Sequence, residues 1–160
     1  MKKLLLIRHA KATHETGFTD FERPLKPSGL QDAAIMAGRL KQHAYIPQLL
    51  VSSPSLRTMS TANVFSQHLA IPAAEEVSSI YEAGQDELVD IISQLIDTHN
   101  FIGLVGHNPG IGQVLYHLTG EIYSVPPGAV ALIEFDIETW AAVSDKSGKL
   151  VYYDTPKDNG

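Results

Sequence analysis

Three short apolar runs, each followed by polar residues, constrain the fold of this chain most strongly. They cover residues 4–7, 49–53 and 101–106. Each run has the length of a buried strand, and the stretches between them carry apolar residues at helical spacing. Strands that alternate with helices are typical of α/β proteins, in which ligands collect beyond the carboxyl ends of the strands. We therefore expect an α/β fold whose functional residues lie where these runs end.

Four segments predict helices, because their apolar residues recur at helical spacing. The helices are expected over residues 27–40, from Ser53-Pro54 to residue 69, over 86–99, and from Asn108-Pro109 to 118. Serine or asparagine followed by proline is typical of a helix start. The segments 129–137, 140–143 and 150–153 predict strands that pair at one edge of the sheet. The polar residues 11–26 predict a loop over the strand ends, where loops carry function.

Length and charge narrow the class of protein. A chain of 160 residues predicts one domain, residues 1–160, that folds without a metal or disulfide. Eighteen acidic and twelve basic side chains give a formal net charge of −6, which favours neither nucleic acid nor an anionic membrane as partner. The apolar run after Met1-Lys2-Lys3 is too short for a signal peptide. We expect a cytoplasmic protein without a membrane span, and the sequence leaves its oligomeric state open.

The ends of the three apolar runs carry basic side chains suited to phosphate chemistry. Arg8 and His9 follow the first run, Arg57 follows the second, and His107 follows the third. A neutral imidazole is a nucleophile near neutral pH, and its attack on phosphorus gives a phosphohistidine. Arginine offers a planar fork of donors that matches phosphate geometry. The pattern therefore predicts a phosphate site with a histidine nucleophile.

These residues, in their order along the chain, resemble the histidine phosphatase superfamily, also called phosphoglycerate mutase-like. The resemblance is carried by Arg8-His9-Ala10, Ser53-Pro54-Ser55-Leu56-Arg57 and Gly106-His107-Asn108-Pro109. Within the superfamily, the short length together with Arg23-Pro24-Leu25 and Ser28-Gly29 resembles the SixA branch of phosphohistidine phosphatases. The resemblance implies a three-layer α/β/α sandwich with a mostly parallel sheet. It also implies that His9 is the nucleophile, while Arg8, Arg57 and His107 form the phosphate pocket.

Other residues follow from the same resemblance. Asn108 and Arg23 are expected to contact the substrate. Glu82 is the candidate general acid, Asp20 is an alternative, and a phosphoramidate substrate could be protonated without either. Most members of the superfamily have glycine where this chain has Ala10, and alanine fits there if its φ is negative.

The substrate and the reaction leave three alternatives. About fifty residues separate Arg57 from His107, and predicted helices occupy most of them, which leaves little chain for a lid. An open pocket favours phosphohistidine on a signalling protein as substrate. The alternatives are a phosphatase of small phosphoesters, such as sugar phosphates or nucleotides, and a phosphate-binding adaptor that does not turn over.

No metal or other cofactor is expected. The chain has no cysteine, and its other histidines lack the spacing of metal ligands. These histidines are His14, His43, His68, His99 and His117.

Overall fold

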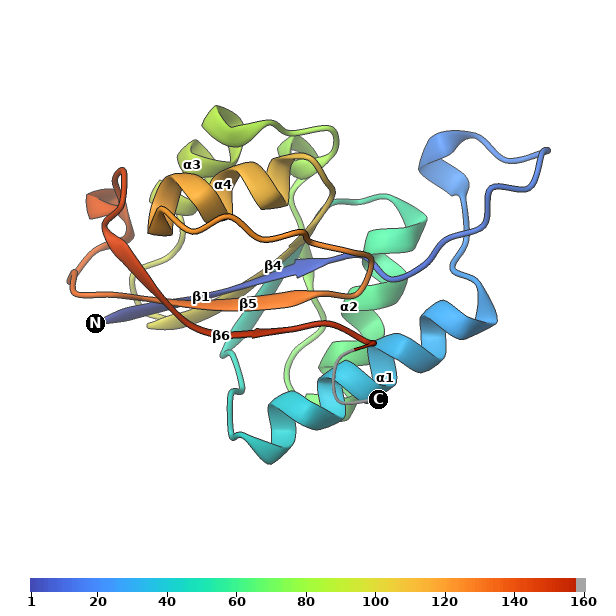
Figure 1. Cartoon of the computed structure of the whole chain (residues 1–160), viewed down its shortest axis with the longest axis horizontal. Coiled ribbons are helices and arrows are strands. Elements are labelled where there is room, and N and C mark those ends of the chain that lie inside the picture. Colours follow the sequence, from blue (N-terminus) through green and yellow to red (C-terminus); the bar gives the residue numbers. More distant parts are fainter. Residues whose placement is uncertain (158–160) are drawn as a thin grey trace.

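A computed structural model describes residues 1–157, which form six strands around which the helices pack (Figure 1). The strands are β1 (Lys2–Arg8), β2 (Leu49–Ser52), β3 (Glu75–Glu76), β4 (Phe101–Gly106), β5 (Val130–Phe135) and β6 (Gly148–Asp154). The helices are α1 (Pro27–Gln42), α2 (Leu56–Leu69), α3 (Gln85–Ser93) and α4 (Gly110–Thr119). Three short 3-10 turns are η1 (Asp20–Glu22), η2 (Ser78–Ile80) and η3 (Trp140–Ala142).

The six strands form one mixed sheet in the order β3-β2-β4-β1-β5-β6. Strands β3, β2, β4 and β1 run parallel, whereas β5 pairs antiparallel with both β1 and β6. The mostly parallel sheet that the sequence predicts is thus confirmed, and its antiparallel part is confined to one edge.

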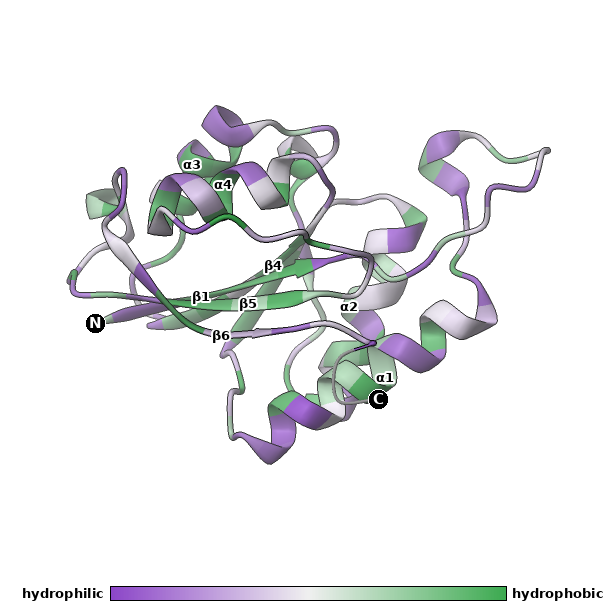
Figure 2. Cartoon of the chain, viewed as in Figure 1, coloured by the Kyte–Doolittle hydropathy of each residue, from purple (hydrophilic) through white to green (hydrophobic). Residues whose placement is uncertain are grey.

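Helices cover both faces of this sheet. In Figure 1, α1 and α2 lie below the strands and α3 and α4 lie above them. Successive side chains of a strand point to opposite faces, so Leu5 and Ile7 pack with α1 and α2, while Leu4 and Leu6 pack with α3 and α4. Figure 2 shows the consequence: the central strands are apolar, and polar residues gather on the outer sides of the helices. The three-layer sandwich is confirmed.

The strand register brings the predicted functional segments to one level. Arg8 at the end of β1 lies opposite Gly106 at the end of β4, and Ser52 at the end of β2 lies opposite Val105. Because these strands are parallel, the residues that follow them emerge at the same edge of the sheet.

The start of α2 differs from the prediction. The helix begins at Leu56, and Ser55, rather than Ser53, is its N-cap and accepts a hydrogen bond from the backbone N–H of Thr58. Pro54 holds the turn between the strand and this cap. Because Ser53 is not the cap of α2, its hydroxyl can form a hydrogen bond with Nε2 of His107 after the neighbouring strand β4.

Two further predictions are wrong for one tertiary reason. Helix α3 ends at Ser93 instead of residue 99, and the predicted strand at 140–143 is the turn η3. The Asp97 carboxylate accepts the backbone N–H of Trp140, and the His99 carbonyl accepts the indole N–H of the same residue. Buried Lys2 also donates to the Asp97 carbonyl at 2.9 Å. These contacts need the chain to leave the helix, and they override the local pattern.

No helix in the described part of the chain combines the length and apolar character needed to cross a bilayer.

Gly29, in the first turn of α1, lies unusually close to the chain that leaves β1. A Cβ atom at this position would lie 2.3 Å from the backbone carbonyl oxygen of Lys11. The backbone N–H of Lys26, which precedes the helix, donates to that same oxygen at 2.9 Å. The absence of a side chain thus lets α1 close the base of the loop between β1 and α1.

We expect Gly29→Ala to destabilise the fold, because backbone atoms cannot yield to the added carbon. The expected loss is about 1–3 kcal/mol of unfolding free energy, as for overpacked interiors. Urea unfolding followed by circular dichroism measures it. Gly38→Ala in the same helix is the control: nothing lies within 4 Å of its Cβ, so we expect a gain of roughly 0.5–1 kcal/mol. Equal effects of the two substitutions would contradict the close approach at Gly29.

Candidate active site

The residues after β1, β2 and β4 surround one cavity of about 380 Å³. Six of the seven side chains predicted for the site line it: Arg8, His9, Arg23, Arg57, His107 and Asn108. The seventh, Glu82, lines an adjacent cavity of about 440 Å³ that shares Arg57, His107 and Asn108 with the first. The structure therefore brings together side chains that are up to a hundred residues apart in the sequence.

His9 is held in one orientation by the backbone beside it. Its Nδ1 lies 2.8 Å from the carbonyl oxygen of Ala10, which can only accept a hydrogen bond, so Nδ1 carries the proton. The backbone N–H of Ala10 donates to the hydroxyl of Thr61, and Ala10 is absent from the positive-φ residues of the described chain, as its side chain requires. The lone pair of the ring thus belongs to Nε2.

Burial keeps His9 neutral. Only 8 % of the residue is exposed, and this desolvation lowers the pKa of His9 to about 3, against a smaller opposing effect of the Ala10 hydrogen bond. The charges of Arg57 and Arg8 act in the same direction as burial. The Nε2 lone pair is therefore available throughout the physiological pH range.

His107 faces His9 across the cavity. The centroids of the two rings are 5.5 Å apart, and Nε2 of His107 lies 2.8 Å from the hydroxyl of Ser53. Burial, followed by the charge of Arg57, lowers the pKa of His107 to about 4. Its Nδ1 is buried and has no hydrogen-bond partner in residues 1–157.

Arg8 and Arg57 place two guanidinium groups beside the imidazoles. Arg8 donates from Nη1 to the carbonyl of Val125 at 2.9 Å. Burial, and then the charge of Arg57, lower the pKa of Arg8, as expected for two cations that share a pocket. The Nε atoms of both arginines are buried without a partner among the described residues. Unpartnered buried donors of this kind favour an anion between them.

Asn108 and the end of β4 tie the cavity to α4. The side-chain amide of Asn108 donates to the Val125 carbonyl at 2.8 Å, and its oxygen accepts the backbone N–H of Gly112 at 3.2 Å. Arg8 donates to the same carbonyl. Asn108 therefore positions Arg8 and the first turn of α4 in addition to lining the cavity.

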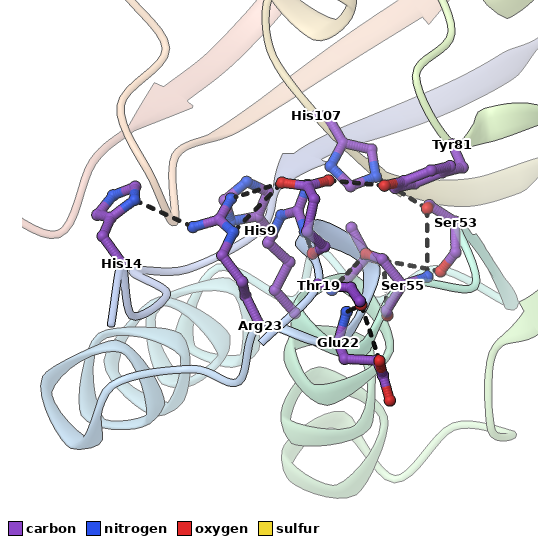
Figure 3. A network of polar contacts seen from close by, with 12 residues as sticks. His9, His14, Thr19, Glu22, Arg23, Ser53, Ser55, Tyr81 and His107 are labelled. Atoms are coloured by element: carbon purple, nitrogen blue, oxygen red, sulfur yellow. Dashed lines mark hydrogen bonds and ion pairs between the residues drawn. The ribbon is translucent and has the colours of Figure 1, made fainter. Parts of the chain in front are cut away.

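Asp20 in η1 lines the cavity and is the centre of a polar network, whose partners Arg23 and Tyr81 are labelled in Figure 3. Its Oδ2 accepts hydrogen bonds from Arg57 Nη2 at 3.1 Å and from the Tyr81 hydroxyl at 2.6 Å. Its Oδ1 accepts one from Arg23 Nε at 3.3 Å. The pKa of Asp20 is lowered to about 2, first by the hydrogen bond from Tyr81 and then by the hydrogen bond and the positive charge of Arg57.

Two polar residues that contact His107, Tyr81 and Ser53, were not predicted from the sequence. Tyr81 packs edge-on against the ring of His107, with centroids 5.6 Å apart, and its hydrogen bond to Asp20 raises its pKa. Ser53 was interpreted only as a helix cap. Neither residue has a sequence signal for this role, because only the fold brings residues 53 and 81 next to residue 107.

Glu82 has an unusual backbone conformation. It is exposed, and its φ is +59°, which a residue with a side chain rarely adopts. Such strain is retained where the surroundings fix it, and it is common at functional sites. Here it directs the turn before α3 toward the cavity shared with Arg57 and His107.

The site has no cluster of metal ligands. No group of three or more histidine and carboxylate side chains within residues 1–157 is arranged to hold a metal ion.

Comparison with known sequences gives a family match and distant relatives. Residues 4–78 match the profile of the histidine phosphatase superfamily, branch 1. An uncharacterized protein of Mycobacterium tuberculosis strain H37Rv is 25% identical over 163 residues, which cover 94% of this chain and all of that protein. An uncharacterized chloroplast protein of Arabidopsis thaliana is 26% identical over 158 residues, 92% of this chain and 72% of its own length.

Comparison with solved structures shows the same fold. A protein of Agrobacterium tumefaciens with the provisional name phosphohistidine phosphatase SixA has a TM-score of 0.82 at 24% identity, covering 97% of this chain and 98% of its own. The protein histidine phosphatase SixA complexed with tungstate has a TM-score of 0.75 at 23% identity, with coverages of 96% and 97%. A phosphoserine phosphatase of Entamoeba histolytica in complex with 3-phosphoglyceric acid has a TM-score of 0.69 at 16% identity, with coverages of 97% and 98%.

We expect buried His9 and partly buried His107 to make the protein sensitive to mild acid. A base whose pKa is lowered by folding binds fewer protons in the folded than in the unfolded state. Its contribution is therefore complete above the unfolded pKa of about 6.5 and is lost as the pH falls toward the folded values, about 3 for His9 and about 4 for His107.

Urea unfolding between pH 6.5 and pH 4.5 measures this effect. His9→Gln removes one of the two titrating groups, so its stability should fall less steeply than that of the wild type. The difference is at most about 1.4 kcal/mol per pH unit, the slope for one proton. Identical slopes would show that His9 is not kept neutral by the fold.

Proposed function

We propose that this chain is a metal-independent phosphatase in which His9 accepts the phosphoryl group. The match of residues 4–78 to the histidine phosphatase superfamily and the fold shared with the SixA-type structures support the proposal. The observation that carries the proposal is the state of the His9 ring. Its Nδ1 proton is held by the Ala10 carbonyl, its Nε2 lone pair is free, and two arginines lie beside it.

The proposed reaction has two displacements. In the first, Nε2 of His9 attacks phosphorus, a P–N bond forms, and the bond from phosphorus to the leaving group breaks. In the second, water attacks the phosphohistidine, the P–N bond breaks, and inorganic phosphate leaves. Arg8, Arg57 and His107 would bind the phosphoryl oxygens in both steps, because preorganised donors stabilise charge that develops in the transition state.

The proton for the leaving group has two candidate sources on the protein. Asp20 already accepts hydrogen bonds from Tyr81, Arg57 and Arg23, and this network lowers its pKa to about 2, so a proton is harder to place on Asp20 than on a carboxylate without such partners. Glu82 is exposed at the end of the cavity that Arg57 and His107 also line. We therefore favour Glu82 as the donor for substrates whose leaving group needs one.

Phosphohistidine on a signalling protein of the cytoplasm is the substrate we favour. The two SixA structures described above share this fold, which supports phosphohistidine as the class of substrate. The first loop, whose Asp20 and Arg23 line the cavity, also exposes Phe18 and Phe21, so a protein surface could contact this loop. A small phosphoester is the alternative, and the likeness to a phosphoserine phosphatase favours it. Rapid turnover of one metabolite, with none on a phosphorylated histidine domain, would decide for the alternative.

We expect a covalent phosphoenzyme on His9. Brief incubation with a radiolabelled phosphodonor followed by denaturation should leave a label that is lost in acid and retained in base. His9→Ala should remove both the label and, by at least about a thousandfold, the turnover of an aryl phosphate, because the nucleophile is lost.

His68→Ala is the control for this experiment. His68 is exposed on α2, its Nδ1 lies 3.0 Å from the Val64 carbonyl oxygen, and it does not line the cavity of His9, so label and turnover should be unchanged. Full turnover in His9→Ala would reject the mechanism. Phosphate binding without label or turnover would identify an adaptor instead of an enzyme.

We expect Glu82→Gln to lower kcat for some substrates and to leave kcat nearly unchanged for others. For an alkyl phosphate, whose leaving group needs a proton, kcat should fall by about a hundredfold, as for the loss of a general acid. For an aryl phosphate with a good leaving group, or for a phosphohistidine domain, kcat should change less than threefold. Glu121→Gln, a carboxylate beyond α4, is the matched control. A uniform fall across all substrates would show that Glu82 positions the site instead of donating a proton.

A further inference from the structure

The carboxylate of Asp20 accepts hydrogen bonds from donors beside the proposed phosphate site. Both terminal nitrogens of Arg57 are engaged by this residue: Nη1 donates to its backbone carbonyl at 2.6 Å, and Nη2 donates to its carboxylate at 3.1 Å. Arg23 and the Tyr81 hydroxyl donate to the same carboxylate. Figure 3 shows two members of this network, Arg23 and Tyr81, near His9 and His107.

The two sides of this contact differ in burial. The Arg57 side chain is 7 % exposed, whereas the Asp20 side chain is 57 % exposed. The guanidinium is thus fixed in the wall of the cavity, and the carboxylate approaches it from solvent. Of the two, only the carboxylate can leave without exposing the interior.

The segment that carries Asp20 is attached at its ends and loosely packed between them. Backbone contacts join Ala12 to Leu25 and the N–H of Thr13 to the Pro24 carbonyl. Between these points η1 has no buried residue, and Phe18 and Phe21 expose large apolar side chains. Segments with few buried contacts open at low free energy.

We propose that the Asp20 carboxylate is an internal competitor of the substrate: it occupies the Arg57 and Tyr81 donors in the free protein, and an incoming phosphoryl group displaces it from them together with the rest of segment 13–24, which includes Arg23. The proposal rests on the proposed function in that it takes the cavity of His9 as the phosphoryl site. It adds that this site closes on itself when no phosphoryl group is bound.

Displacement is favoured by the charge of the ligand. A phosphoryl dianion carries more negative charge than a carboxylate. It also offers the donors three acceptor oxygens, whereas a carboxylate offers two. The tethered carboxylate, in turn, lowers the apparent affinity for any anion by the fraction of molecules that are open. Asp20 would therefore keep weak monoanions out and let phosphoryl groups in.

The experiment measures binding of inorganic phosphate by calorimetry in the absence of substrate. Asp20→Asn and Asp20→Ala should each bind phosphate about tenfold more tightly than the wild type, the factor expected if nine in ten free molecules are closed. Glu22→Gln is the matched control: it removes a charge of the same sign from the same turn, but its contact is with Thr19, so affinity should stay within twofold.

A second measurement follows the segment itself. Phosphate should speed hydrogen exchange of the amides of residues 13–24 in the wild type, because their link to Arg57 is broken. In steady-state kinetics the Asp20 variants should show a lower KM with kcat unchanged or higher. A positioning role for Asp20 predicts the reverse, a loss of kcat.

Several outcomes would overturn the proposal. They are phosphate affinity that is unchanged or weaker in both Asp20 variants, an equal gain in Glu22→Gln, or slower exchange in residues 13–24 on binding. Binding is read without turnover, so the two proposals separate. Tighter phosphate binding in the variants without any phosphoenzyme would reject the phosphatase and keep the competitor, and unchanged binding with an intact phosphoenzyme would do the opposite.

Discussion

The parallel pairing of β1, β4 and β2 is the constraint on which the site depends. It sets Arg8 level with Gly106 and Ser52 level with Val105, so the residues after each strand meet at one edge of the sheet. Side chains on rigid strand ends hold their geometry better than side chains on loops. A change of one residue in this register would move His9 away from His107 and turn every core side chain of β1 to the opposite face.

Burial at this edge gives the histidines and arginines opposite tendencies. Desolvation keeps both imidazoles neutral, which preserves the His9 lone pair, whereas the guanidinium groups stay charged because their intrinsic pKa is so high. The result is a local positive field in a chain whose formal net charge is −6. An anion relieves the repulsion between Arg8 and Arg57 and pairs their buried Nε donors, so the free site is less stable than the occupied one. Asp20 supplies part of that relief from the protein itself.

The fold, and the meeting of six of the seven candidate residues at one cavity, could be predicted from the sequence because the relevant signals are local. Short apolar runs, Gly120 at the end of α4, and basic residues directly after strands can be identified without knowledge of tertiary contacts. The predictions failed where contacts between distant segments determine the local structure. Asp97 and His99 lie outside the helix and accept hydrogen bonds from Trp140. Lys2 has the sequence context of a surface residue, yet it is buried, and its ammonium group donates to the Asp97 carbonyl and the Asn100 side chain. The network of Asp20 and Tyr81 belongs to the same class, since residues 61 positions apart give no local signal.

The spacing between Arg57 and His107 predicted little chain for a lid, and the structure shows that the cover over the cavity comes instead from the loop between β1 and α1. Gly29 fixes the base of this loop against Lys11, while η1 at its tip has no buried residue. A stable base with a loosely packed tip allows the tip to move without unfolding the strand end that carries His9. The contact from Asp20 to Arg57 then has to be strong enough to order the tip and weak enough for a phosphoryl group to replace it. A half-exposed carboxylate on a buried guanidinium meets both conditions, because water stabilises the carboxylate once it is released.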